Sequence, residues 1–212
     1  MRRPFALIAC TAALALAACS QDPPEQKAGD EETSTSVANA SPSAPAGSEV
    51  GTAEAEGSRY TSAYTPFELE VCRVTGENPE GASVNYTCPG YADVPIFLHL
   101  GDGRFDLDAG LDSDEFMTIG AFNDIGERLE WRLHDGEPFA VIFRYLDVAP
   151  QGEGRTVLAV EKIGRAGSPG CRVAHVSGDT PDANRVAREI ADGRTADFRC
   201  GADEMRVVGN AR

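Results

Sequence analysis

Apolar and polar residues alternate along much of the chain from Phe67 onward, and Gly, Pro, Asn and Asp interrupt the alternation at short intervals. A period of two residues is typical of strands with one buried face, and short turns between such strands favour antiparallel pairing. Two Asp-Gly pairs, at 102–103 and 135–136, separate alternating segments, which indicates tight type I′ hairpins. The pattern predicts an α+β fold class: a mostly antiparallel β-sheet that carries one helix.

The alternation also predicts the limits of the strands. A first strand has Phe67, Leu69 and Val71 on one face and Cys72 on the other. The segment 139–146 is apolar almost throughout, as expected of a central strand that is covered on both faces. The remaining predicted strands are 84–88, which Pro89 and Gly90 would end, 96–100, 105–107, 129–133, 155–163, 171–176, and a last strand through Phe198 and Cys200, with 205–208 as its extension.

One helix is predicted at about residues 181–192, packed on the sheet. Thr180 can cap its N-terminus, and Pro181 suits the first helical position. An apolar stripe recurs at the spacing of one helical face. It consists of Ala183, Val186, Ala187 and Ile190. Gly193 is the expected end of the helix.

Four cysteines lie in the part of the chain that has strand character: Cys72, Cys88, Cys171 and Cys200. An even number of cysteines in an exported chain indicates disulfides, and four cysteines allow three pairings. We expect Cys72 to pair with Cys88 and Cys171 with Cys200, because sequence proximity and turn signals already bring each pair together. Zinc is disfavoured, since none of these cysteines lies in a C-x-x-C pair.

The first eighteen residues have the anatomy of an export signal. Arg2 and Arg3 precede an apolar stretch, residues 5–18, that is too short to span a bilayer. The segment Leu16–Cys19 resembles the cleavage motif of a bacterial lipoprotein precursor. The resemblance implies removal of residues 1–18, acylation of Cys19 and attachment to a membrane through the acyl chains. Because Ser20 rather than Asp follows Cys19, it favours the outer membrane, with the protein facing the periplasm.

The chain after Cys19 divides by composition. Residues 20–57 are rich in Ala, Ser, Pro and Glu and contain no Leu, Ile, Phe or Trp. Such a segment cannot bury enough apolar surface to offset the entropy lost on ordering, so residues 19–57 are predicted to be the lipidated cysteine and a disordered acidic tether. Residues 58–212 have the length of a single globular domain.

The formal net charge of −15 at pH 7 limits the partners of the chain. Phosphate binding needs clustered Lys and Arg, so nucleic acid is not an expected partner. Repulsion from anionic lipids leaves the acyl chains as the expected membrane attachment. A cationic envelope protein remains a possible partner, although acidity also keeps a protein soluble without one.

The histidines offer no catalytic pattern. His99, His134 and His175 lack a partner that sequence spacing would reveal, and a general base needs one. We expect His134 to be exposed near its turn and His175 to share a strand face with Cys171 and Val173, partly buried beside a disulfide. The sequence therefore predicts no catalytic residue.

An acidic run is the best candidate for a ligand site, because carboxylates suit calcium. Its members are Asp102, Asp106, Asp108, Asp112, Asp114 and Glu115. An EF-hand fits in no register: with Asp106 as the first ligand, Leu111 stands where Gly is needed and Met117 where Glu is needed. Alternating acids are more often a solvated face, so no metal and no cofactor is predicted.

Two further resemblances concern the folded part. The stretch from Phe122 to Leu133, with Pro138, Phe139, Arg144 and Tyr145 after it, resembles bacterial exported proteins of unknown function and implies no activity. The architecture of a small disulfide-bonded β-domain on a lipid anchor is also similar to periplasmic lysozyme inhibitors, but the chain carries no inhibitory motif. We expect a lipid-anchored, non-enzymatic binding or interaction module. The alternatives are an envelope hydrolase with a carboxylate and histidine site assembled by folding, and an inhibitor or cation-binding module that uses the acidic segment 102–115.

Overall fold

Two sheets make up the described part of the chain, which is residues 59–113, 115–152 and 154–211 of a computed structural model. The predicted signal, Cys19 and the tether lie outside the described residues. The larger sheet has seven strands in the order β1-β7-β8-β9-β10-β11, with β6 also paired to β8. Their bounds are β1 Tyr60–Pro66, β6 Asn123–Ile125, β7 Arg128–His134, β8 Glu137–Asp147, β9 Thr156–Lys162, β10 Cys171–Ser177 and β11 Arg206–Val208. Only the β10–β11 pairing among these described strands is parallel.

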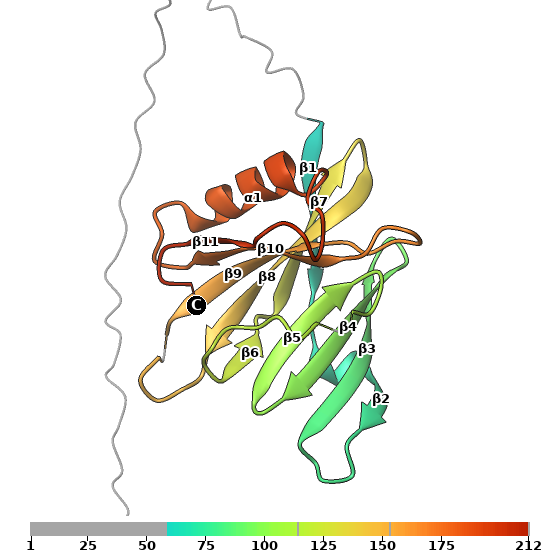
Figure 1. Ribbon diagram of the computed structural model, residues 1–212, viewed down its shortest axis with the longest axis vertical. Coiled ribbons are helices and arrows are strands. Elements are labelled where there is room, and N and C mark those ends of the chain that lie inside the picture. The colour runs from blue at the N-terminus through green and yellow to red at the C-terminus, as the bar shows by residue number, and fades with distance from the viewer. Residues whose placement is uncertain (1–58, 114, 153, 212) are drawn as a thin grey trace, which may run out of the picture. The chain divides into compact units, whose positions relative to one another are not determined.

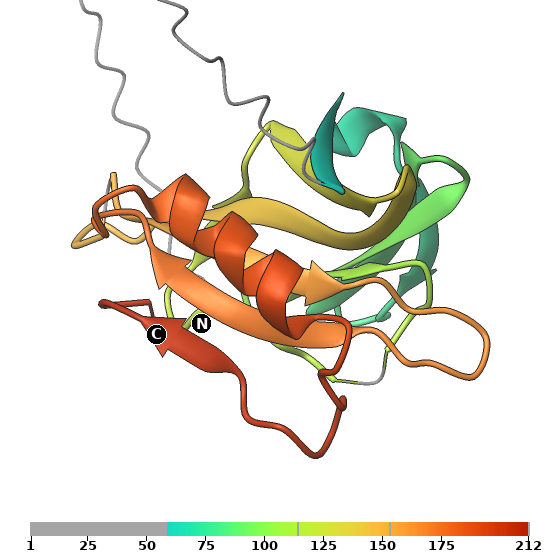
Figure 2. The same cartoon turned by 90° about the horizontal axis from the view of Figure 1, so that it is seen from above.

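The smaller sheet is antiparallel throughout, in the order β2-β3-β4-β5. Its strands are β2 Arg73–Glu77, β3 Ser83–Tyr91, β4 Val94–Gly101 and β5 Arg104–Ala109. The helix α1, Ala183–Arg194, covers the face of the larger sheet that is turned away from the smaller one (Figure 1). Seen from above, α1 lies across β9 and β10 (Figure 2). The predicted α+β class, mostly antiparallel with one C-terminal helix, is confirmed.

The smaller sheet, the larger sheet and α1 form three layers, and an apolar core lies between each pair of neighbouring layers. The core between the sheets contains the single tryptophan, Trp131, with Leu98, Leu107 and Phe143. The core under α1 contains Ala187 and Ile190 from the helix, packed on strands β8, β9 and β10. The larger sheet is thus covered on both faces, which explains the almost continuous apolar run predicted for 139–146. No helix among the described residues is long and apolar enough to cross a bilayer.

Both predicted disulfides are present. Cys72 is bonded to Cys88, and Cys171 to Cys200. The first bond ties the segment before β2 to β3, and the second ties β10 to the turns that follow α1. Stable disulfides are typical of proteins outside the reducing cytoplasm, so the domain belongs to an oxidising, extracytoplasmic compartment.

The predicted first strand is wrong. Residues Leu69–Val71 form a short 3₁₀ helix, η1, in which the backbone N–H of Cys72 donates to the carbonyl of Leu69. Val71, assigned to the buried face, is 56% exposed. Local i→i+3 bonds therefore satisfy this backbone in place of a neighbouring strand. The actual first strand, β1, is largely polar and pairs with β7 along its whole length, so alternation did not reveal it.

The second predicted strand does not end at Pro89 and Gly90, because β3 continues to Tyr91. The register with β4 shifts between Cys88 and Tyr91, which forms a bulge. A bulge leaves a residue outside the ladder, so Pro89 is tolerated there without a backbone N–H. Gly90 is required by space: a Cβ atom there would lie 2.0 Å from the carbonyl oxygen of Val94.

The helix begins and ends two residues later than predicted. Asp182, not Thr180, precedes its first residue and has a left-handed backbone with φ of 56°, so Pro181 stays outside the helix. Gly193 does not end it, since the N–H of Thr195 still donates to the carbonyl of Ala191. The predicted apolar stripe is correct: Ala183, Ala187 and Ile190 are buried and Val186 is half-buried.

The predicted last strand through Phe198 and Cys200 is also wrong, because Phe198 lies in irregular structure and Cys200 in a turn. The backbone N–H of Arg199 donates to the carboxylate of Asp203, which stabilises these turns. Within the predicted extension at 205–208, Arg206–Val208 forms the strand β11.

Candidate metal centre

The β4–β5 hairpin brings His99 and Asp108 together on one face of the smaller sheet. The two central residues of its turn, Asp102 and Gly103, have φ of 51° and 67°, as a type I′ turn requires. This turn fixes the register, so His99 lies opposite Asp106 and Phe97 opposite Asp108. His99 and Asp108 are therefore diagonal neighbours on adjacent strands, which long side chains can span.

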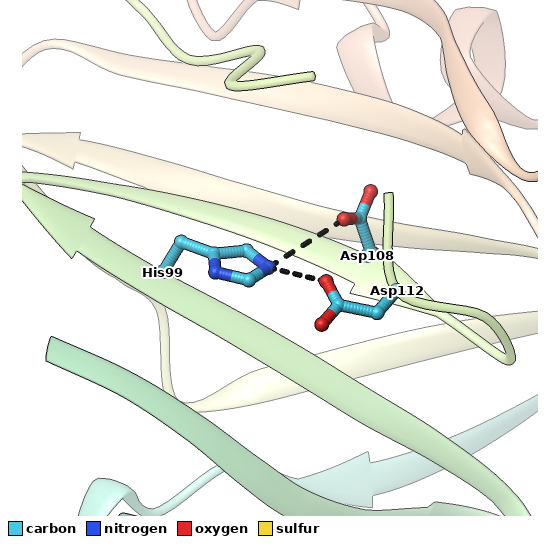
Figure 3. Close-up of side chains that lie close together, drawn as sticks. All are labelled: His99, Asp108 and Asp112. Atoms are coloured by element: carbon cyan, nitrogen blue, oxygen red, sulfur yellow. Dashed lines mark hydrogen bonds and ion pairs between the residues drawn. The ribbon is translucent and has the colours of Figure 1, made fainter. Parts of the chain in front are cut away.

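Asp112, from the loop after β5, completes a group of three. Nε2 of His99 lies 2.7 Å from Oδ1 of Asp112 and 3.8 Å from Oδ2 of Asp108. One ligand atom from each residue lies within 4.8 Å of the others. Figure 3 shows both carboxylates facing the same imidazole nitrogen. The side chain of Asp108 is 6% exposed and that of Asp112 is 53% exposed, so the group opens to solvent on the loop side.

Asn85 on β3 orients the imidazole. Its Oδ1 atom lies 3.1 Å from Nδ1 of His99. An amide oxygen only accepts hydrogen bonds, so Nδ1 is the donor in this contact. Nε2, on the other side of the ring, lies within hydrogen-bonding distance of Oδ1 of Asp112, at 2.7 Å. A proton or a metal cation among these three side chains would offset the repulsion between the two carboxylates. A histidine that donates from one nitrogen to a fixed oxygen and points the other inward is typical of metal sites.

Asp108 lies in a buried environment beside a second carboxylate, Asp106. Burial, and then the negative charge of Asp106, raise the pKa of Asp108 to about 6. A hydrogen bond from the backbone N–H of Ser113, 3.0 Å from Oδ2, and the charges of Arg172 and His99 oppose this increase. A bound cation would further favour the ionised form of Asp108.

The donor set favours a first-row divalent metal over calcium. Calcium takes six to eight oxygen ligands, whereas this group offers two carboxylates and one imidazole nitrogen. Imidazole with carboxylates suits Zn²⁺, Mn²⁺, Fe²⁺, Co²⁺ or Ni²⁺, with water in the remaining positions.

The rest of the acidic run is not part of this group. Asp102 lies in the hairpin turn beside Arg104, with 3.6 Å between the charged atoms. Asp106 is 1% exposed and accepts a hydrogen bond from Arg172. Glu115 is exposed, and Asp114 lies outside the described residues. The run therefore does not form a single solvated face, since Asp106 and Asp108 are buried.

A second polar cluster, which the sequence did not reveal, surrounds Arg172 between the two sheets. Its guanidinium donates to Glu161 at 2.8 Å, to Asp106 at 3.0 Å and to the hydroxyl of Tyr145 at 3.0 Å. It also lies 2.9 Å from Nε2 of His175. Burial raises the pKa of Glu161 to about 8, and burial together with Arg172 lowers the pKa of His175 to about 3. The hydrogen bonds of Arg172 therefore join β5 of one sheet to β9 and β10 of the other.

The predicted surroundings of His175 are wrong. A bulge between Arg172 and Ala174 shifts the alternation of β10 by one residue. Arg172 and His175 consequently point to the same side, while Val173 and Ala174 both pack under α1. His175 is 2% exposed and faces the charged cluster rather than the disulfide. His134 is half-exposed and stacks on Tyr60 with 4.8 Å between ring centroids.

No family model, curated protein or solved structure matches the chain.

Proposed function

We propose that this chain is a lipid-anchored envelope protein that acts as a non-enzymatic binding module, and that it binds a first-row divalent cation through His99, Asp108 and Asp112. The observation that carries the proposal is the convergence of one imidazole nitrogen and two carboxylates within 4.8 Å. The orientation of His99 by Asn85 supports it, because that contact leaves Nε2 directed at the carboxylates.

The cellular location is part of the proposal. The segment Leu16–Cys19 supports acylation of Cys19, and Ser20 favours the outer membrane. The two disulfides agree with a periplasmic domain. A tether of residues 20–57 would hold that domain away from the lipid head groups.

A hydrolase site at the Arg172 cluster has less support. A catalytic histidine and carboxylate must be reached by substrate, yet His175, Glu161 and Arg172 are each at most 3% exposed. The hydrogen bonds of this cluster link strands of both sheets, which is what a structural role requires.

Thermal unfolding of the untagged protein with added metal tests the binding. We expect Zn²⁺, Mn²⁺ or Ni²⁺ at about a hundredfold excess over its Kd to raise Tm by roughly 5 °C or more, because only the folded state binds. Ca²⁺ at the same concentration should raise Tm less. The substitutions His99→Gln and Asp108→Asn should each abolish the increase, whereas the control His134→Gln should keep it.

Two results would contradict metal binding at this site. One is a wild-type Tm that none of the three metals changes at millimolar concentration. The other is a metal-dependent increase that survives in both the His99 and the Asp108 variants, which would assign the metal to other residues.

A further inference from the structure

A groove opens on the opposite side of β4 from the candidate metal centre. Residues from the end of β1, from η1 and from β6 and β8 line one part of it, and residues from β4 and β5 line the other. Its volume is about 660 Å³. Successive residues of a strand point to opposite faces, so Leu98 lines the groove while its neighbour His99 belongs to the metal centre.

The floor of the groove is apolar. It is formed by Phe67, Leu98, Phe105, Ile125 and Leu146. Leu98 is fully buried in the core between the sheets, whereas Phe105, Ile125 and Leu146 are half-buried. The floor is therefore the exposed edge of the main core, and apolar side chains of a ligand would gain from covering it.

The rim of the groove is acidic. Glu68, Glu70, Asp124 and Glu127 all line it, and all four are exposed. Among the described residues, no ion pair or hydrogen bond is formed by any of these carboxylates, whereas acids elsewhere pair with Arg155, Arg185, Arg188 and Arg199. Four like charges around one opening repel one another and create a local negative potential.

The groove is held in shape by covalent and backbone bonds. The disulfide from Cys72 to Cys88 fixes η1 against β3. The backbone N–H of Phe67 donates to the carbonyl of Glu127 at 2.8 Å, which joins the two sides of the acidic rim. A ligand would therefore meet a preformed surface and lose less free energy to ordering of the protein.

From this combination we infer that the groove binds a cationic, amphipathic segment of another polypeptide, with Lys or Arg side chains on the rim and apolar side chains on the floor. The rim carboxylates do not converge into a metal-ligand group in the described part of the chain, so they suit several separated charges better than one ion. Nucleic acids and anionic lipids carry the wrong charge for this rim. The inference is independent of metal binding, since the two sites share no residue.

Fluorescence anisotropy with a defined probe tests the inference. The probe is fluorescein-labelled Gly-Lys-Leu-Lys-Phe-Lys-Gly, and two control peptides replace either its Lys residues with Glu or its Leu and Phe residues with Ser. We expect saturable binding of the probe to the wild-type protein, and affinities at least about tenfold lower for both control peptides.

A quadruple variant and a matched control locate the binding. Neutralising the rim with Glu68→Gln, Glu70→Gln, Asp124→Asn and Glu127→Gln should weaken binding of the probe about tenfold. The control variant changes the same number of exposed acids elsewhere: Glu77→Gln, Glu80→Gln, Glu137→Gln and Asp197→Asn. It should weaken binding less than about threefold, because only the long-range field changes.

Several outcomes would overturn the inference. Equal weakening in both quadruple variants would indicate a non-specific charge effect, and equal binding of the Ser peptide would remove the role of the floor. Absence of saturable binding by wild type would exclude such a ligand. A dimer detected by sedimentation velocity and dissociated by the rim variant would assign the groove to a second copy of this chain.

Discussion

At the scale of single residues, the charged cluster around Arg172 sets how stability depends on pH. One oxygen of Glu161 accepts a hydrogen bond from Arg172, whereas its other oxygen, Oε1, is buried without a partner. The ionised form is therefore poorly solvated, which agrees with the raised pKa of about 8. The pKa of His175 is lowered to about 3, because its imidazolium would be buried and would lie beside Arg172.

We predict that Glu161→Gln removes a pH-dependent loss of stability. Between the ordinary pKa of 4.5 and the folded pKa of about 8, the folded state holds one proton more than the unfolded state. The free energy of unfolding therefore decreases as pH rises, by at most about 1.4 kcal/mol per pH unit. Urea unfolding from pH 5 to 8 should show the variant gaining stability relative to wild type across this range.

His175 does not disturb that comparison. Its lowered pKa makes stability increase with pH between about 3 and 6.5, but this contribution is common to the wild type and the variant. A stability difference that stays constant from pH 5 to 8 would show that Glu161 is ionised in the folded protein throughout.

At the scale of elements, α1 is stabilised by packing on the larger sheet more than by capping of its ends. No side chain caps its N-terminus, and Asp182 precedes it in a left-handed conformation. Its buried face consists of Ala183, Ala187, Ile190 and Ala191. Only Ile190 among these is large, so we expect it to contribute most of the apolar contact with the larger sheet.

We predict that Ile190→Ala lowers the free energy of unfolding by about 2 to 4 kcal/mol, since it leaves a cavity under the helix. The control is Arg185→Ala on the exposed face, where two surface ion pairs are lost. It should change the free energy of unfolding little, because solvent screens both exposed pairs. Chemical denaturation with the disulfides intact would measure both values, and similar values for the two variants would refute the assigned face.

The sequence predicted those elements whose geometry depends on residues close together in the chain, such as the hairpin turns. The Asp102–Gly103 turn is sufficient to place His99 diagonally to Asp108, so the hairpin signal already implied two of the three residues of the candidate metal centre. Asp112 was not, because an irregular loop has no register. The sequence did not reveal β1, because this strand is polar and is held in place by its pairing with β7. The bulge near Val173 reversed the predicted face of His175. Long-range pairing and bulges leave no periodic signal in one sequence.

At the scale of the whole molecule, the two candidate sites lie on opposite faces of one sheet and offer different chemistry. The metal centre is small and partly buried, whereas the groove is wide and acidic. Because they share strand β4 and no side chain, a variant in one site should leave binding at the other measurable. The metal titration and the peptide titration therefore test the two proposed sites independently.

The anchor is tested by Cys19→Ala. We predict that this variant moves the protein from the membrane fraction to the soluble fraction and abolishes labelling with a palmitate analogue, because acyl chains are its proposed attachment. Cys10→Ala is the matched control and should change neither result, since Cys10 lies within the predicted signal. Wild-type protein that takes up no label would contradict lipidation.

Both disulfides join cysteines that follow one another in the described part of the chain, the first pair 16 residues apart and the second 29. A chain that enters an oxidising compartment from its N-terminus exposes Cys72 and Cys88 before Cys171 and Cys200. Pairing in order of emergence thus yields the native connectivity, and no wrong bond has to be broken. Maturation of this domain should accordingly need an oxidant for its thiols but little help from a disulfide isomerase.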